Sequence, residues 1–350
     1  MTAFNQTSLV EHVKYITVLF SLLLSPVLPS SVSADASTNG DGTSLDFFTA
    51  TFENDLFVGE DNGYTNGFGL TFATGPFDEF THDNTPNWLQ PIVEPLYINT
   101  LPNKQRGIAH MFFQRMQTPD DIEQTEVIND DLPYAGLLAW QGIFYAWDDH
   151  VADQLSVYLG VVGPASYAEK TQNIVHDVLG SDNPKGWDNQ IGNEAVFKVE
   201  ADRVWNIYRS DDALQYDVIG FSGAAIGTMD SHIKSGIAIR SGKNLDTSFP
   251  TFSLQTDRQV NPLAMTDAAD FYLFAGVQLK YVFNDIMING NTFKHSHSVP
   301  IKHTLNQFSF GGVWSINSIA VVFQFSSLSS RTRVLNAREK FGALSITYQY

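Results

Sequence analysis

Apolar and polar residues alternate along many segments of the chain, and this alternation limits the folds that it can adopt. In one segment Ile319, Val321, Phe323 and Phe325 repeat at every second position. A period of two residues is that of a β-strand with one apolar face. Gly, Thr, Ser, Asn and Phe are spread along the whole sequence, which also favours strands over helices. The pattern predicts an all-β protein.

The alternating segments number about a dozen. The predicted strands are 46–54, 66–74, 105–114, 136–146, 153–162, 195–206, 214–227, 231–241, 270–283, 303–314, 317–327 and 340–350. An even number of strands of about 9–11 residues is typical of bacterial outer-membrane barrels. We therefore predict a 12-stranded antiparallel outer-membrane β-barrel with a helix in an extracellular loop. The alternative is a soluble jelly roll or sandwich, which has the same alternation.

Both ends of the sequence favour the membrane barrel. The last predicted strand finishes on Tyr350, a residue of its apolar face, as the closing strand of a barrel commonly does. Near the start, the apolar run in 15–34 ends in the small residues Val32-Ser33-Ala34. This is a secretory signal pattern with a small-x-small cleavage site. We expect residues 1–34 to be a signal peptide and residues 35–350 to form the transmembrane β-barrel.

Composition excludes several function classes. The formal net charge is −18, whereas nucleic-acid binding needs clustered Lys and Arg, so we expect no nucleic-acid partner. The absence of Cys excludes thiol catalysis and disulfide bonds. An acidic chain of this kind suits a solvated surface, extracellular loops or binding of divalent cations.

An even barrel has both chain ends on the periplasmic side, which predicts the position of every loop. The outward loops are expected at 55–65, 115–135, 163–194, 228–230, 284–302 and 328–339. The long connections 76–104 and 242–269 then lie on the periplasmic side. Periplasmic turns are usually short, so these two lengths stand against the predicted register.

The first hairpin carries an unusual number of polar groups where its strands meet the loop. If Phe48 and Phe52 face lipid, then Glu53 and Asp55 face the lumen. By the same alternation Thr65 faces the lumen, with Asn54 beside this group. Charged side chains also line the lumens of barrels that have no active site, so this cluster alone does not establish one.

The outward loop 163–194 contains a predicted amphipathic helix. Ser166 and Glu169 have capping-box spacing, and Gly180 provides the stop. His176 lies at the edge of the apolar face, which we expect to pack on the rim of the barrel. A single His on such a helix is more often structural, but the nearby Asp182 allows a metal-binding or general-base role.

Together these residues resemble a known family, the outer-membrane lipid A 3-O-deacylases (LpxR-like). The resemblance covers most of the chain after residue 34. It is carried by "ENDLF…GYTNG" at 53–67, "DLPYAG" at 131–136, "GP…AEKTQNIVHDVLG…GWDNQIGNE" at 163–194 and "INGNTF" at 288–293.

The resemblance implies calcium-assisted hydrolysis of the ester-linked 3′-acyl chains of lipid A. Matched residue by residue, the family's calcium-binding pair falls on Asn54 and Asp55, and its catalytic Thr falls on Thr65. The family's general base falls on His176, and its acid six residues later on Asp182, which is one methylene shorter than the usual Glu. Oxygen ligands of this kind suit Ca²⁺, and a neutral imidazole can take a proton from water.

One departure concerns phosphate recognition. A well-studied type of the family has a Lys-Arg pair in the second outward loop, whereas this loop is acidic throughout. Lys185, Arg331, Arg333 and Arg338 on other outward loops are expected substitutes. The expected partners are lipopolysaccharide and the outer membrane, with the protein a monomer. The alternative function is that of a non-enzymatic barrel, either a pore or a structural surface protein.

Overall fold

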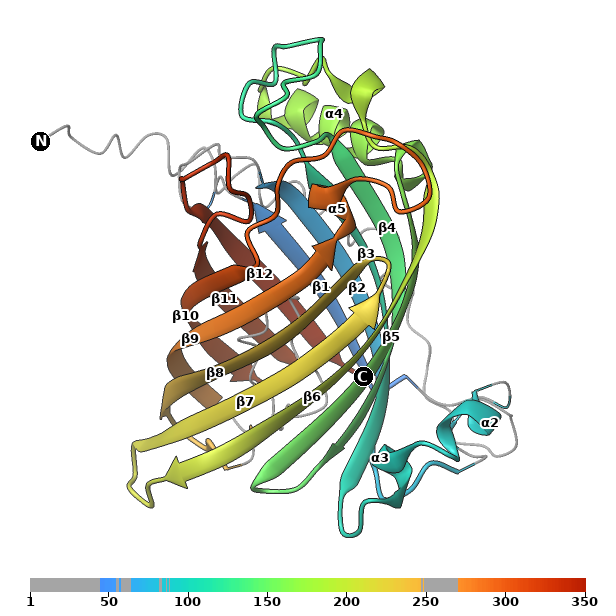
Figure 1. Cartoon of the computed structure of the whole chain (residues 1–350). Helices are drawn as coiled ribbons and strands as arrows, with labels where there is room; N and C mark the ends of the chain where they lie inside the picture. The colour runs from blue at the N-terminus through green and yellow to red at the C-terminus, as the bar shows by residue number, and fades with distance from the viewer. Residues whose placement is uncertain are drawn as a thin grey trace, which may run out of the picture.

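The described part of the chain forms one closed β-barrel (Figure 1). The structure is a computed structural model, and it describes residues 45–54, 57, 64–81, 84–85, 87, 89–246, 248 and 270–350. The predicted signal peptide (1–34) and Asp55 lie outside these residues. Each strand pairs with its neighbours in sequence, and β1 pairs with β12 to close the cylinder. A sandwich or jelly roll is therefore excluded.

All twelve predicted strands are confirmed, with ends shifted by a few residues. They are β1 (Phe47–Asn54), β2 (Tyr64–Phe77), β3 (Gln105–Gln117), β4 (Ala135–Trp147), β5 (Val151–Val162), β6 (Glu194–Arg209), β7 (Gln215–Gly227), β8 (Asp230–Gly242), β9 (Asp270–Asp285), β10 (Thr304–Ile316), β11 (Ile319–Leu328) and β12 (Glu339–Gln349).

The two faces of the wall differ as the alternation predicts. On the inner face the Thr49 and Thr347 hydroxyls hydrogen-bond across the closure at 2.8 Å. On the outer face large apolar side chains are exposed, among them Leu279 (64%) and Trp314 (65%). Contact of such an apolar band with water is unfavourable, whereas contact with lipid acyl chains is not.

The lumen is closed at one end by loops that fold into its mouth. The short helix α5 (Ile286–Asn289) is buried there, and the Gln117 side-chain amide donates to the Pro133 and Met287 carbonyls, each at 3.0 Å. Arg331 in turn donates to the Gln117 side-chain oxygen at 2.7 Å. Leu132, Ile288 and Val299 pack together in the same plug. Beneath it, described residues that include Leu305, Gln307 and Phe341 line a cavity of about 110 Å³.

The long connection between β2 and β3 lies at the opposite end, as predicted (Figure 1). It contains the short helices α2 (Gln90–Val93) and α3 (Tyr97–Thr100). Their side chains Leu89, Val93 and Ile98 pack against Ile108 and Phe144 of the wall. None of the helices in the described ranges is long and apolar enough to span a bilayer.

Candidate active site at the α4 end

The helix predicted in the third outward loop is present as α4 (Ala168–Leu179). It ends where expected, because Gly180 has the left-handed φ of 72° and its N–H bonds to the His176 carbonyl. The predicted capping box is wrong. The N-cap is Tyr167 in a left-handed conformation without a side-chain cap, and Ser166 belongs to the preceding turn η2 (Pro164–Ser166).

Helix α4 packs on the outer face of the wall, at the ends of β3 and β4. Gln114, which alternation places on the outer face, donates to the Ser166 carbonyl at 2.6 Å. Gly136 lies beneath the helix start, where a Cβ would meet the Ser166 Oγ at 2.2 Å and the Ala168 Cβ at 2.3 Å. Glycine therefore permits this close approach of helix and strand.

The second and third outward loops hold each other over the helix. The Lys185 backbone N–H donates to the Ile122 carbonyl at 2.8 Å, and the Asn189 amide donates to the Thr125 carbonyl at 2.6 Å. The Lys185 ammonium forms an ion pair with Glu123 at 2.5 Å, and this hydrogen bond raises the pKa of Lys185. Lys185 is therefore already paired and is a poor substitute for the missing phosphate-binding base.

His176 is half-buried on α4, and its ring is fixed by the chain itself. Its Nδ1 lies 2.6 Å from the backbone carbonyl oxygen of Asp182. A carbonyl oxygen only accepts hydrogen bonds, so Nδ1 carries the proton and the neutral ring leaves Nε2 as an acceptor. Asp182, the residue expected to orient the ring, contacts it through its backbone carbonyl, whereas the Asp182 side chain is exposed.

The end of the first hairpin lies on the same rung of the sheet as the base of α4. Asn54 of β1 pairs with Asn66 of β2, and Asn66 pairs with Met116 of β3. Met116 packs with Ala168 of α4. Neighbouring strands are about 4.8 Å apart, so Asn54 lies roughly 10 Å from the strand under the helix. The structure brings this part of the predicted set to one edge of the barrel.

A β-bulge interrupts β2 at Thr65. The pairing of β2 with β3 shifts between Tyr64, opposite Gln117, and Asn66, opposite Met116, so Thr65 is the additional residue. Alternation does not continue through a bulge, and bulges commonly redirect a side chain beside a site. The sequence expectation for Thr65 assumed unbroken alternation, and the Thr65 side chain lies outside what the structure describes. Helix α4 itself lies on the other face of the wall, outside the lumen.

The donor chemistry at this edge suits a hard cation such as Ca²⁺. Asn54, buried at the end of β1, provides an amide oxygen, whereas the carboxylate of the preceding Glu53 belongs to the lumen face with Thr49 and Thr51. Within the described ranges no three His, Asp or Glu residues come together as a metal-binding group. The carboxylate that would complete the predicted set, Asp55, lies outside those ranges.

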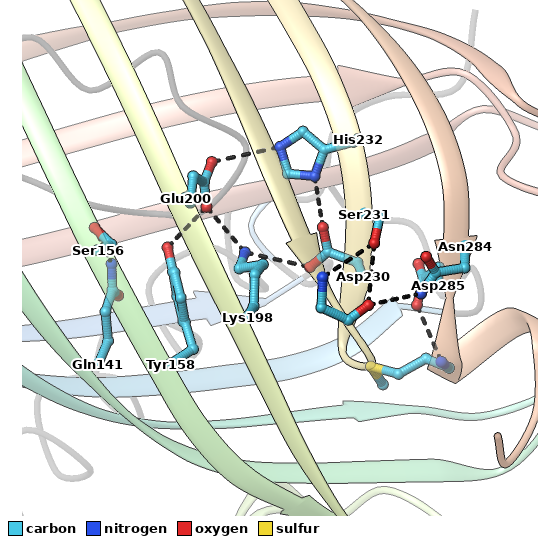
Figure 2. A network of polar contacts seen from close by, with 12 residues as sticks. Gln141, Ser156, Tyr158, Lys198, Glu200, Asp230, Ser231, His232, Asn284 and Asp285 are labelled. Carbon is cyan, nitrogen blue, oxygen red and sulfur yellow. Dashed lines mark hydrogen bonds and ion pairs between the residues drawn. The ribbon is translucent and has the colours of Figure 1, made fainter. Parts of the chain in front are cut away.

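The sequence reasoning did not identify a second titratable cluster, which lies in the lumen (Figure 2). The His232 ring faces Asp230 at 2.5 Å and Glu200 at 3.4 Å. Glu200 also accepts from the Tyr158 hydroxyl at 3.0 Å and pairs with Lys198 at 3.0 Å. Alternation indicates that these side chains face the lumen, but it does not predict which residues of β5, β6 and β8 contact one another.

This lumen cluster resembles a catalytic triad in composition but not in access. The His232 and Glu200 side chains are 0% exposed, and Lys234 pairs with both Glu200 (2.5 Å) and Asp202 (3.0 Å). Charges that are paired this completely hold strands together, and no substrate atom reaches them. The α4 site is therefore the better candidate.

Comparison with known proteins agrees with the barrel fold. A search of curated proteins found no match. The fold is similar to the structure of LpxR from Salmonella typhimurium, with a TM-score of 0.73 and 15% identity over 87% of this chain and all of that one. The β domain of the Bordetella autotransporter BrkA has a TM-score of only 0.44, with 7% identity over 87% of this chain and 99% of its own. The family model described as outer membrane protein LpxR matches residues 18–350, and the chain therefore belongs to this family of outer-membrane proteins.

Proposed function

We propose that this protein is a calcium-dependent lipid A deacylase that hydrolyses the ester-linked 3′-acyl chains of lipopolysaccharide. The proposal combines family membership with the geometry of the α4 end. The observation that carries it is the position of His176. Its ring is held at 2.6 Å by the Asp182 carbonyl, on a helix that packs against the outer face of the wall.

In this role His176 acts as a general base. Its Nδ1 keeps its proton on the Asp182 carbonyl, and its Nε2 takes a proton from a water molecule. The resulting hydroxide adds to the ester carbonyl carbon, the bond from that carbon to the sugar oxygen breaks, and the proton held on Nε2 passes to the sugar oxygen. The products are a sugar hydroxyl and a fatty acid. Thr65 is proposed to contact the reacting ester from the bulge of β2.

Asn54 and Asp55 are the residues that would hold calcium. A bound Ca²⁺ at this edge supplies Lewis-acid stabilisation of negative charge on the ester oxygen. The chain's own contribution is to fix Asn54 at the end of β1, paired on one side with Asn66 and on the other with Gly342 of β12.

The outer face below α4 suits a lipid substrate. Phe112, Leu138 and Leu159 are 53%, 39% and 53% exposed on β3, β4 and β5. Alternation places all three on the outer face with Gln114, which contacts the α4 segment. A lipid in the membrane would reach the site laterally, with its acyl chains on this surface and its sugar near the helix.

We place the α4 end on the extracellular side. The opposite end has tight connections, such as 148–150 and 317–318, whereas the α4 end carries the long loops 118–134, 163–193 and 286–303. Short periplasmic turns and longer extracellular loops are the rule in such barrels. This orientation would expose the site to the outer leaflet, where lipid A lies.

The mouth of the lumen argues against the alternative function, a pore. A channel needs a continuous aqueous path, but Gln117 is fully buried between loops that meet across the mouth. A pore also has no use for a helix on the outer face that carries an oriented imidazole.

The test is fatty-acid release from purified lipopolysaccharide by the full-length protein in detergent, followed by mass spectrometry of the lipid A. We expect release with added calcium and none after chelation. His176→Ala should lower the rate by about 10²–10⁴-fold, the usual contribution of a general base.

The matched control is His150→Ala, which changes an exposed histidine in the β4–β5 turn at the opposite end. Its activity should equal that of the parent. Unchanged lipid A after incubation with a folded, calcium-loaded parent would overturn the proposal and favour a structural role.

A further inference from the structure

The distribution of charge along the chain is strongly asymmetric. The whole chain has a net charge of −18, yet residues 290–350 contain six Lys and Arg and a single acid, Glu339. Glu339 is already paired with Arg331 at 2.8 Å. The segment forms β10, β11, β12 and the loops at their α4 end. A basic region on an otherwise acidic protein indicates an anionic partner.

Arg338 stands on the outer surface of this part of the wall. Its guanidinium donates to the Ser327 hydroxyl at 2.8 Å, the Ser327 carbonyl at 2.7 Å and the Asn306 side-chain oxygen at 2.9 Å. Asn306 and Ser327 occupy outer-face register positions, beside Leu279 and Phe308. Arg338 is thus exposed and held in place by uncharged groups.

A bridge between Ile301 and Thr332 brings two more exposed bases to the same rim. The Arg333 guanidinium donates to the Ile301 carbonyl at 3.1 Å, and the Lys302 backbone N–H donates to the Arg331 carbonyl at 2.8 Å. Across the described ranges Lys302, Arg333 and Arg338 form no ion pair. We call these three residues the basic rim.

An apolar surface lies directly below the basic rim. Phe283 (56%), Phe308 (44%) and Phe310 (47%) are exposed on the outer faces of β9 and β10. His303, next to Lys302, stacks on Tyr281 with ring centroids 5.6 Å apart. Cations above aromatic and aliphatic side chains match a lipid with a phosphorylated head group and acyl chains.

We propose that the basic rim is a docking site for a phosphorylated lipid of the outer leaflet, with its phosphates on the three bases and its chains on the apolar surface. The site is separate from the candidate active site. Helix α4 packs on β3 and β4, and strands β2 and β1 lie between β3 and β12 along the wall. Figure 1 shows the β11–β12 loop and α4 as distinct parts of the same end. The proposal rests on the proposed orientation of the barrel, but not on hydrolysis.

The experiment counts lipids bound to the full-length protein by native mass spectrometry in detergent, with chelator present. The probes are bisphosphorylated lipid A and the same lipid without phosphates. All variants carry His176→Ala, which prevents turnover. Arg338→Gln should weaken binding of the bisphosphorylated lipid about fivefold, since one base near a membrane surface contributes about 1 kcal/mol. Arg333→Gln/Arg338→Gln should remove one bound lipid.

Lys243→Gln is the matched control, because it removes one exposed positive charge at the opposite end. It should bind as the parent does, and Arg338→Lys should recover part of the affinity. Equal binding of both probes, or binding by the double variant that equals that of the parent, would overturn the proposed lipid-binding site. Hydrolysis is measured separately, on proteins that retain His176, so failure of the proposed deacylation leaves this result unaffected.

Discussion

Two histidines show how differently the same side chain is used in this barrel. His176 lies on an exposed helix, with one ring nitrogen on a backbone carbonyl. His232 lies inside the lumen, between Asp230 at 2.5 Å and Glu200 at 3.4 Å. The buried His232 has the partners of a catalytic histidine, whereas the half-buried His176 keeps part of its ring open to solvent.

The difference shows that the partner set alone does not identify a base. A base needs an unused nitrogen within reach of a water and a substrate. In the lumen both nitrogens of His232 face carboxylates, and the lysines beside them complete the charge balance. The lumen cluster contributes stability, whereas we assign chemistry to the α4 end.

The largest expected effect on stability is that of Lys234→Met. This change leaves Glu200 and Asp202 buried without one of their cations. Breaking one side of a buried ion pair typically costs about 3–5 kcal/mol. Urea unfolding in detergent, followed by tryptophan fluorescence, measures the loss. The exposed Lys243→Met serves as the control, and an unchanged midpoint for Lys234→Met would show that the lumen charges are not structural.

The variant Gly136→Ala tests the close packing of α4 on β4. The added Cβ would lie 2.2 Å from Ser166 Oγ, so the helix must move away from the wall. Overpacking of this kind costs about 1–3 kcal/mol, and a displaced base lowers the rate by up to about 10²-fold. Lipid A deacylation and unfolding are measured together.

Gly142→Ala on the same face of β4 is the control for Gly136→Ala, because its Cβ would meet only the tip of the Trp140 side chain. If Gly136→Ala were as active as Gly142→Ala, the position of α4 on the wall would not matter for catalysis.

The role of the Asp182 carbonyl is tested by Asp182→Ala. This variant removes the carboxylate but keeps the backbone oxygen that lies 2.6 Å from His176 Nδ1. We expect the rate to fall by less than about tenfold, which corresponds to at most about 1.4 kcal/mol. A loss as large as that of His176→Ala would instead assign the orientation of the ring to the carboxylate.

The smallest effect is expected for Lys185→Gln. The ion pair of Lys185 with Glu123 is exposed, and such pairs contribute little. The backbone bond from Lys185 to Ile122 remains and continues to tie the two loops together. Deacylation should stay within about twofold of the parent. A larger loss would show that Lys185 contacts the substrate.

Local patterns in the sequence predicted much of this arrangement. The alternation of apolar and polar residues indicated each strand, because one face of every strand contacts a different medium. Gly180 indicated the end of α4, because glycine has no Cβ and so adopts the left-handed conformation that commonly ends a helix. The capping box failed because the segment before α4 forms a separate turn, which places Tyr167 in the cap position.

The sequence by itself determined the closed barrel, its strand order and the helix that bears His176, since these depend on periodicity and on local stop signals. Only the tertiary structure decided that α4 packs outside the wall on Gly136, that a bulge interrupts alternation at Thr65, and that a carbonyl holds the His176 ring. The same holds for the pairing of His232 with Glu200. The physical reason is that alternation specifies which face a residue occupies, whereas contacts between loops and between distant strands depend on shape and register.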